Sequence, residues 1–147
     1  MTEASDARRG ERNHNPCNLR YDPGIRWQGL DHPPADDHGL CRFVDDEHGL
    51  RAGARDIHVK WATHGWRTVS EIIDHYAPPN ENDTGAYIAF VCRRLGVAAD
   101  APLDLGDPTV LGQFVTAIVT EEEGRDIYAD ALIARAVADA LDLPAPA

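Results

Sequence analysis

Three consecutive glutamates, Glu121 to Glu123, stand directly before Gly124 at the end of a predicted helix. Adjacent carboxylates repel one another there, and they oppose the negative end of the helix dipole. We place Phe114 at the centre of the buried face and turn about 100° per residue, so that Glu121 falls near that centre. Glu122 then lies about 80° to one side and Glu123 on the far side. Burial and like-charged neighbours raise the pKa of a carboxyl group beside the core, which suits a general acid for glycoside cleavage. The plainer interpretation is a solvated acidic helix end.

A second polar cluster is the segment Tyr76–Thr84, with the sequence YAPPNENDT, between two predicted helices. Asp83 or Thr84 caps the following helix, and capping accounts for these two residues. Capping does not require the amides and the acid of Asn80–Asn82 as well. This loop is therefore a candidate for substrate contacts.

The third candidate is the segment Asn13–Gly29, NHNPCNLRYDPGIRWQG. Side-chain amides can read hydroxyl and N-acetyl groups, and an indole such as that of Trp27 can stack on a pyranose ring. These residue types are typical of sugar-binding clefts. A polar loop with one anchoring tryptophan is the alternative.

No metal or cofactor motif is present. Cys17 and Cys41 could be combined with His38 as zinc ligands, but no C-x-x-C or H-x-x-x-H spacing supports this. An odd count of three cysteines, with Cys92, does not indicate a disulfide framework either. Nucleotide-binding and serine-hydrolase motifs are also missing. We expect no metal and no cofactor.

The elements that must position these residues are mainly helices. Hydrophobic periodicity and capping signals predict five of them. They span Gly49–Thr63, the stretch from the Thr68–Glu71 capping box to Pro78, the stretch from Asp83 or Thr84 to Gly96, the stretch from Asp107-Pro108 to Gly124, and Ala129–Leu141. Before Gly49 we expect loops, with short strands around Leu19–Tyr21 and Leu40–Val44. The organisation predicted is a flexible tail over residues 1–12 and a single domain over residues 13–143.

Charge and hydropathy narrow the functional classes. The net charge is −11, with 25 acidic residues against 14 Lys and Arg, which argues against nucleic-acid binding. No apolar run approaches the length of a membrane span, and the first 15 residues lack the apolar core of a signal peptide. We therefore expect a monomer without membrane insertion that is made in the cytoplasm. It would reach the cell wall by phage-type release or as part of a virion.

Several short blocks resemble a family of phage and prophage proteins known as endolysins or virion structural proteins. The blocks are Asn13–Arg20, Trp27–Gly29, Phe43, Gly49–Ala52, Tyr76–Thr84 and Glu122–Gly124. The family pattern is close to RNNNPGNIR, WQG, GIRA, WAPPxENDT and ENG, and the match covers most of residues 9–128. The chain departs from it at Cys17, Tyr76 and Glu123, where glycine, tryptophan and asparagine are usual.

The same blocks are also similar to those of autolysin-type glucosaminidases of the lysozyme superfamily. In those enzymes the Glu-x-Gly helix comes first, whereas here it comes last. The resemblance implies a lysozyme-like helical fold, circularly permuted, which is feasible because domain termini often lie close together.

Together, the residues and the resemblance predict cleavage of the β-1,4 bond between the amino sugars of peptidoglycan. The resemblance makes Glu122 the general acid, since it matches the Glu-x-Gly spacing, and we take Glu81 as a candidate second carboxylate. The residues expected to bind the glycan strand are Asn15, Asn18, Arg20, Trp27, Tyr76 and Asn82. Hydrolysis and formation of an anhydro product both stay open. The alternative is a non-catalytic virion or wall-binding protein with the same fold.

Overall fold

The computed structural model describes residues 9–79, 82–144 and 146. Its elements are β1 (Leu30–Ala35), β2 (Cys41–Phe43), α2 (Asp46–Ala62), α3 (Val69–Tyr76), α4 (Thr84–Leu95), α5 (Pro108–Glu123) and α6 (Asp130–Ala140). The prediction of a mainly helical fold with at most a small sheet is confirmed. None of the helices in these residues is both long and apolar enough to cross a membrane.

The helix ends follow the capping signals. Asp83 caps α4 through the Ala86 amide, and Asp107 caps α5 through the Thr109 amide. Gly96 and Gly124 end the same two helices in the left-handed conformation that glycine adopts without strain. α2 begins at Asp46, three residues before the predicted Gly49, because the Asp45 side chain accepts a hydrogen bond from the His48 amide.

The sheet is a two-stranded antiparallel hairpin in which Leu30 pairs with Phe43 and Ala35 with Cys41. β2 lies inside the predicted Leu40–Val44 strand, whereas β1 was expected to be loop. At the predicted Leu19–Tyr21 strand there is a single bridge between Arg20 and Leu40. The small sheet is thus formed by residues 30–43, with β1 in place of the strand predicted at Leu19–Tyr21.

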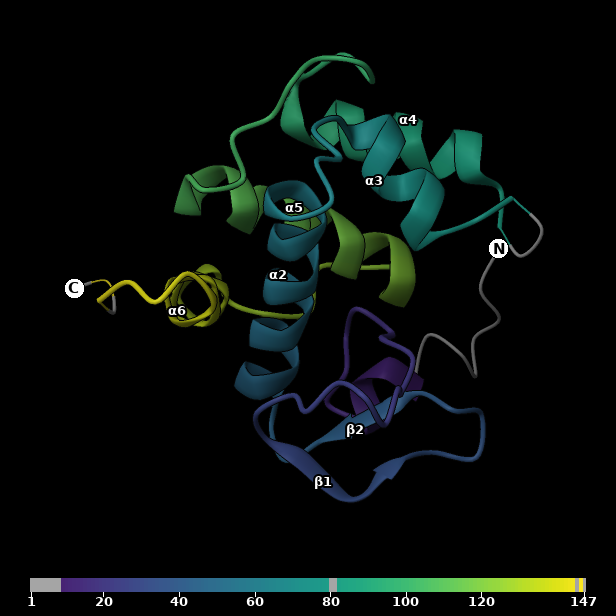
Figure 1. Ribbon diagram of the computed structural model, residues 1–147, viewed down its shortest axis with the longest axis vertical. Coiled ribbons are helices and arrows are strands. Elements are labelled where there is room, and N and C mark those ends of the chain that lie inside the picture. Colours follow the sequence, from purple (N-terminus) through teal and green to yellow (C-terminus); the bar gives the residue numbers. More distant parts are fainter. Residues whose placement is uncertain (1–8, 80–81, 145, 147) are drawn as a thin grey trace.

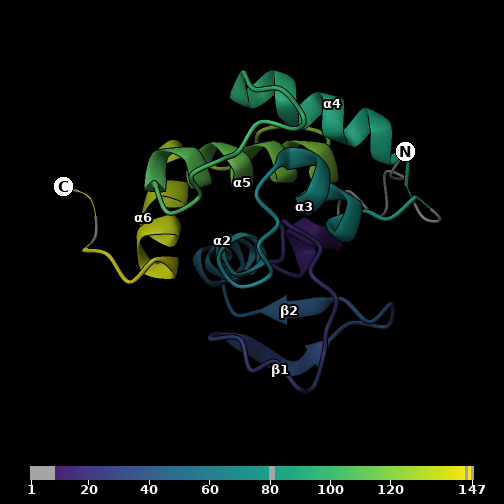
Figure 2. The same ribbon diagram turned by 45° about the horizontal axis from the view of Figure 1, so that its top comes forward.

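The molecule has two lobes, which lie on either side of a pair of central helices (Figures 1 and 2). One lobe contains the hairpin and the segment before it, and the other contains α3 and α4. α2 and α5 run between the lobes, and α6 packs against both of them. The core is built from apolar side chains of all these helices and β2. Its largest fully buried members include Phe43, Leu50, Ile57, Ile72, Leu111, Phe114 and Ile118.

The predicted tail is helical in its last part. Residues 9–12 form a helical turn rather than a loose end. Gly10 is buried against the end of α5, where a Cβ on it would lie 2.0 Å from Glu123 Oε1. The domain therefore begins by residue 9, four residues before the predicted boundary. Residues 1–8 of the predicted tail lie outside the described residues.

Candidate active site

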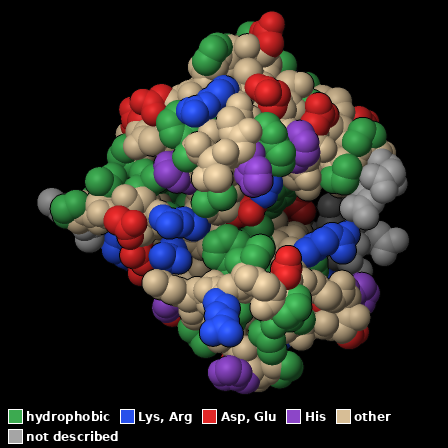
Figure 3. Space-filling model, in the orientation of Figure 1, with side chains coloured by type: hydrophobic (Ala, Val, Ile, Leu, Met, Phe, Trp, Pro, Cys, Tyr) green, Lys and Arg blue, Asp and Glu red, His purple; other side chains and the backbone are tan. Residues whose placement is uncertain are grey.

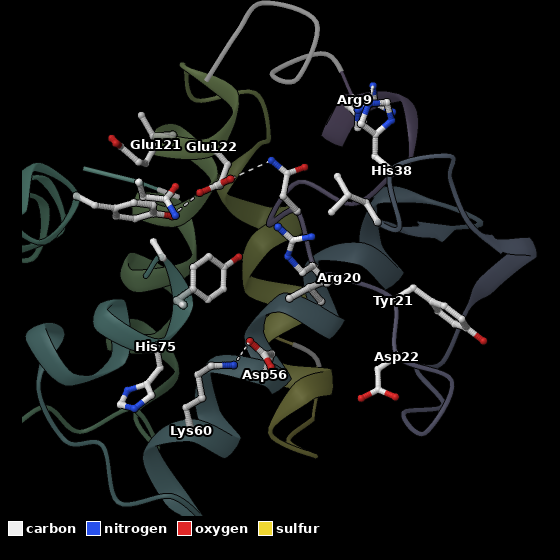
Figure 4. Close-up of a pocket in the computed structure, with 18 of the residues that line it drawn as sticks. Arg9, Arg20, Tyr21, Asp22, His38, Asp56, Lys60, His75, Glu121 and Glu122 are labelled. Carbon is white, nitrogen blue, oxygen red and sulfur yellow. Dashed lines mark hydrogen bonds and ion pairs between the residues drawn. The ribbon is translucent and has the colours of Figure 1, made fainter. Parts of the chain in front are cut away.

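A cleft of about 1550 Å³ lies between the two lobes. Figure 3 shows it as a hollow with acidic and basic side chains around it, and Figure 4 shows its lining. Its floor comes from α2 and α5. One wall comes from the segment 18–27, and the other from α3, α4 and the loop between them. Segments far apart in sequence therefore meet in one cleft.

Glu122 reaches this cleft from the last turn of α5. Asn18 Nδ2 donates to its Oε1 at 2.9 Å, and the Tyr87 hydroxyl donates to its Oε2 at 2.8 Å. Burial raises the pKa of Glu122, although these two hydrogen bonds favour the ionised form, and the charge of Glu121 raises it further. The side chain is partly exposed to the cleft. It is therefore a fixed carboxyl group with a raised pKa that a ligand can reach.

The other two glutamates point in different directions. Glu121 also lines the cleft, and burial raises its pKa. Glu123, predicted on the far side of the helix from the core, is only 4% exposed. That prediction was wrong because the helical turn of residues 9–12 covers the opposite face of α5. Burial raises the pKa of Glu123 to about 8, with added repulsion from Glu122 and Glu11.

The two asparagines of the N-terminal segment have different positions. Asn18 lies in the cleft wall beside Glu122, as expected. Asn15, predicted to bind substrate, is completely buried. Its Nδ2 donates to the carbonyls of Leu19 and Cys41, and its Oδ1 accepts from the Leu19 amide. Asn15 thus has a structural role, in joining the segment before Asn18 to β2.

Four other predicted binding residues line the cleft: Arg20, Trp27, Tyr76 and Asn82. The Tyr76 hydroxyl donates to the carbonyl oxygen of Cys17, so this ring ties α3 to the opposite wall. Asn82 is exposed and donates to the Pro78 carbonyl at 3.3 Å. Glu81, the candidate second carboxylate, lies outside the described residues, as does Asn80.

Some cleft residues escaped the sequence analysis. Tyr87 is only 3% exposed, as expected for an apolar core position, but its hydroxyl reaches Glu122. Asp56 and Lys60 also line the cleft and form an ion pair of 2.6 Å on α2. The i, i+4 spacing of this pair was visible in the sequence, but its position opposite the acidic helix end was not.

One group of side chains has the composition of a metal site. Ligand atoms of Asp36, Asp37 and His38 lie within 4.8 Å of one another. The Asp36 carboxylate is already bonded to Arg9, to Asn13 and to two backbone amides. These contacts explain its strongly lowered pKa. A cation would have to displace Arg9, and the buried thiols of Cys17 and Cys41 do not belong to this group.

No protein-family model matches the chain. Protein P5 of Pseudoalteromonas phage PM2 is 35% identical to it over 130 residues, which cover 86% of this chain and 78% of Protein P5. The chain belongs to the family of Protein P5.

Proposed function

We propose that the chain cuts the glycan strands of peptidoglycan at the β-1,4 bond between amino sugars, with Glu122 as the general acid. The observation that carries this proposal is the environment of Glu122. Its carboxyl group has a raised pKa, two fixed hydrogen-bond donors and access to a long cleft. A general acid for glycoside cleavage needs this combination.

The two donors fit the needs of proton transfer. When Glu122 protonates the glycosidic oxygen, the bond from that oxygen to the anomeric carbon breaks and the acid becomes a carboxylate. Asn18 and Tyr87 both donate to this carboxylate, so their hydrogen bonds strengthen as its charge develops. Burial has the opposite effect: it raises the pKa of Glu122 and so favours the protonated acid before the transfer.

The rest of the cleft has suitable chemistry for a sugar polymer. Trp27, Tyr21 and Phe90 provide ring faces, and Asn82 and Arg20 provide hydrogen-bond donors. Its volume of about 1550 Å³ exceeds the roughly 300–1,000 Å³ of a typical small-molecule pocket, which suits a polymer better than a single small molecule. A lysozyme-like, circularly permuted plan accounts for the Glu-x-Gly helix end meeting the segment 13–29 and the loop after Tyr76.

The phage origin of Protein P5 agrees with release during lysis or transport in a particle. A non-catalytic virion or wall-binding protein is the second candidate, because the same phage origin fits it. The enzyme requires Glu122 for lysis. The non-catalytic protein requires only the surface of the cleft, for binding.

Replacement of Glu122 by glutamine tests the proposal. The new side-chain amide can accept from Tyr87 and, after rotation of the Asn18 amide, donate to its Oδ1, so the fold should persist. It cannot donate the acid proton, and the lytic rate should fall at least about 100-fold. The measurement is the turbidity of permeabilised cells, with Glu121→Gln as the matched control. If Glu122→Gln lyses cells as fast as the wild type does, Glu122 is not the general acid. If the wild type itself does not lyse cells, the result favours the second candidate, a non-catalytic virion or wall-binding protein.

A further inference from the structure

Asp56 is a second carboxylate on the cleft floor, supplied by the rigid central helix α2. One of its oxygens, Oδ2, lies 2.6 Å from Lys60 Nζ, and both side chains are about four-fifths buried, with exposures of 21% and 18%. No residue in the described part of the chain hydrogen bonds to the other oxygen. The carboxylate is thus held by one oxygen, while the other is available to a molecule in the cleft.

Asp56 and Glu122 face the same space from different helices (Figure 4). They make no hydrogen bond to each other, and Arg20 lies between them in this view. Tyr76 lines the same cleft, and burial raises the pKa of its phenol, with smaller effects from nearby charges that include Glu122 and Asp56. Asp56 and Glu122 both line the cleft. Inverting glycosidases hold their two carboxyl groups about 6.5–9.5 Å apart, which leaves room for a water molecule beside the bound sugar.

We infer that Asp56 is the general base that activates water for an inverting hydrolysis, an inference that rests on the proposed function. Glu122 gives its proton to the glycosidic oxygen while the bond to the anomeric carbon breaks. Water attacks that carbon from the opposite face and gives a proton to Asp56. One water is consumed, the new reducing end has the α configuration, and proton exchange with solvent restores both carboxyl groups.

Lys60 holds the Asp56 carboxylate in place for this role. Its charge-assisted hydrogen bond fixes the orientation of the carboxylate, and the side chain of Asp56 is short and anchored on a packed helix. Glu81, the second carboxylate expected from the sequence, lies outside the described residues, and its variant can be compared directly with those of Asp56.

The test uses purified peptidoglycan and three variants: Asp56→Ala, Asp56→Asn and Glu81→Gln. We expect the rate of glycan cleavage to fall at least about 100-fold in both Asp56 variants. Added azide should restore cleavage by Asp56→Ala, with release of an α-glycosyl azide. Wild-type products, read at once by NMR, should carry the α anomer. Asp139→Asn removes the ion-pair partner of Arg51, another α2 residue. Neither residue lines the cleft, so the rate should be unchanged.

Several results would overturn the inference. They are near-normal activity of Asp56→Asn, azide rescue of a Glu81 variant instead, β-configured products, or 1,6-anhydro sugars from the wild type. Each of these still requires a wild type that cleaves glycan. A wild type that releases no sugar would instead contradict the proposed function, so the two failures are distinguishable. Melting curves of both Asp56 variants separate loss of the base from loss of the fold.

Discussion

At the scale of single residues, burial raises the pKa of Glu122, and the hydroxyl of Tyr87 is one of two hydrogen-bond donors that lower it. This hydroxyl is buried and donates to Oε2, which stabilises the ionised carboxylate. Tyr87→Phe removes this donor, so the pKa of Glu122 should rise further above its usual value. The falling limb of the pH–rate profile should move to higher pH.

A suitable control for this profile is Tyr128→Phe. Tyr128 is also a partly buried phenol, and its environment is that of Asp46 and Glu123 rather than the cleft. Its replacement should leave the limb where it is. A Tyr87→Phe profile that coincides with the wild type would mean that Glu122 is not the group titrating in that limb.

Glu123 is a buried carboxyl group with no hydrogen-bond partner for either oxygen among the described residues. Its pKa is about 8 in the folded protein and near 4.5 when unfolded. Since the folded pKa is raised, its contribution to stability is full below pH 4.5 and falls as pH rises to about 8. Glu123→Gln should therefore lose less stability between pH 5 and pH 9 than the wild type does, as measured by thermal melting. A variant that is most destabilised at pH 9 would show that the carboxylate is ionised and well partnered.

At the scale of elements, α2 must approach the segment that carries Asn18. Gly49 makes this possible, because a Cβ there would lie 1.8 Å from the His14 carbonyl oxygen. Gly49→Ala should cost about 1–3 kcal/mol in the free energy of unfolding despite its better helix propensity. Gly112→Ala on α5 has open space around the new methyl group and should stabilise by roughly 0.5–1 kcal/mol. Urea denaturation of both variants checks the pair, and equal effects would contradict the packing described here.

The helices were predictable because their signals are local. Asp83, Asp107, Gly96 and Gly124 mark helix ends through their own backbone contacts, and each is where the sequence placed it. β1 was missed because Pro33 and Pro34 argue against a strand, yet they are tolerated in a two-stranded hairpin.

The site was harder to predict because it depends on contacts between distant segments. Helical periodicity can indicate that Tyr87 is buried, but it cannot show that its hydroxyl meets a residue 35 positions later. Glu123 was misplaced because a single buried face was assumed, whereas α5 is covered on more than one side. The i, i+4 spacing of Asp56 and Lys60 is typical of any ion pair along a helix, and only the fold shows that this pair lines the cleft.

At the scale of the whole molecule, two lobes and two central helices form one cleft, and Glu122 lies on its floor. The net charge of −11 does not favour an anionic polymer. Cations nevertheless occur within the cleft, at Arg9, Arg20 and Lys60. Shape, ring faces and hydrogen bonds rather than overall charge should therefore govern binding.

The most direct test of this account is mass spectrometry of the fragments released from purified peptidoglycan by the wild type and by Glu122→Gln. The account predicts that the wild type releases disaccharide-containing fragments cut between the amino sugars, with peptide bonds intact. It predicts that Glu122→Gln, at equal folded concentration, releases at least about 100-fold less. Wild-type fragments cut only within the peptides, or equal release by the two proteins, would contradict it.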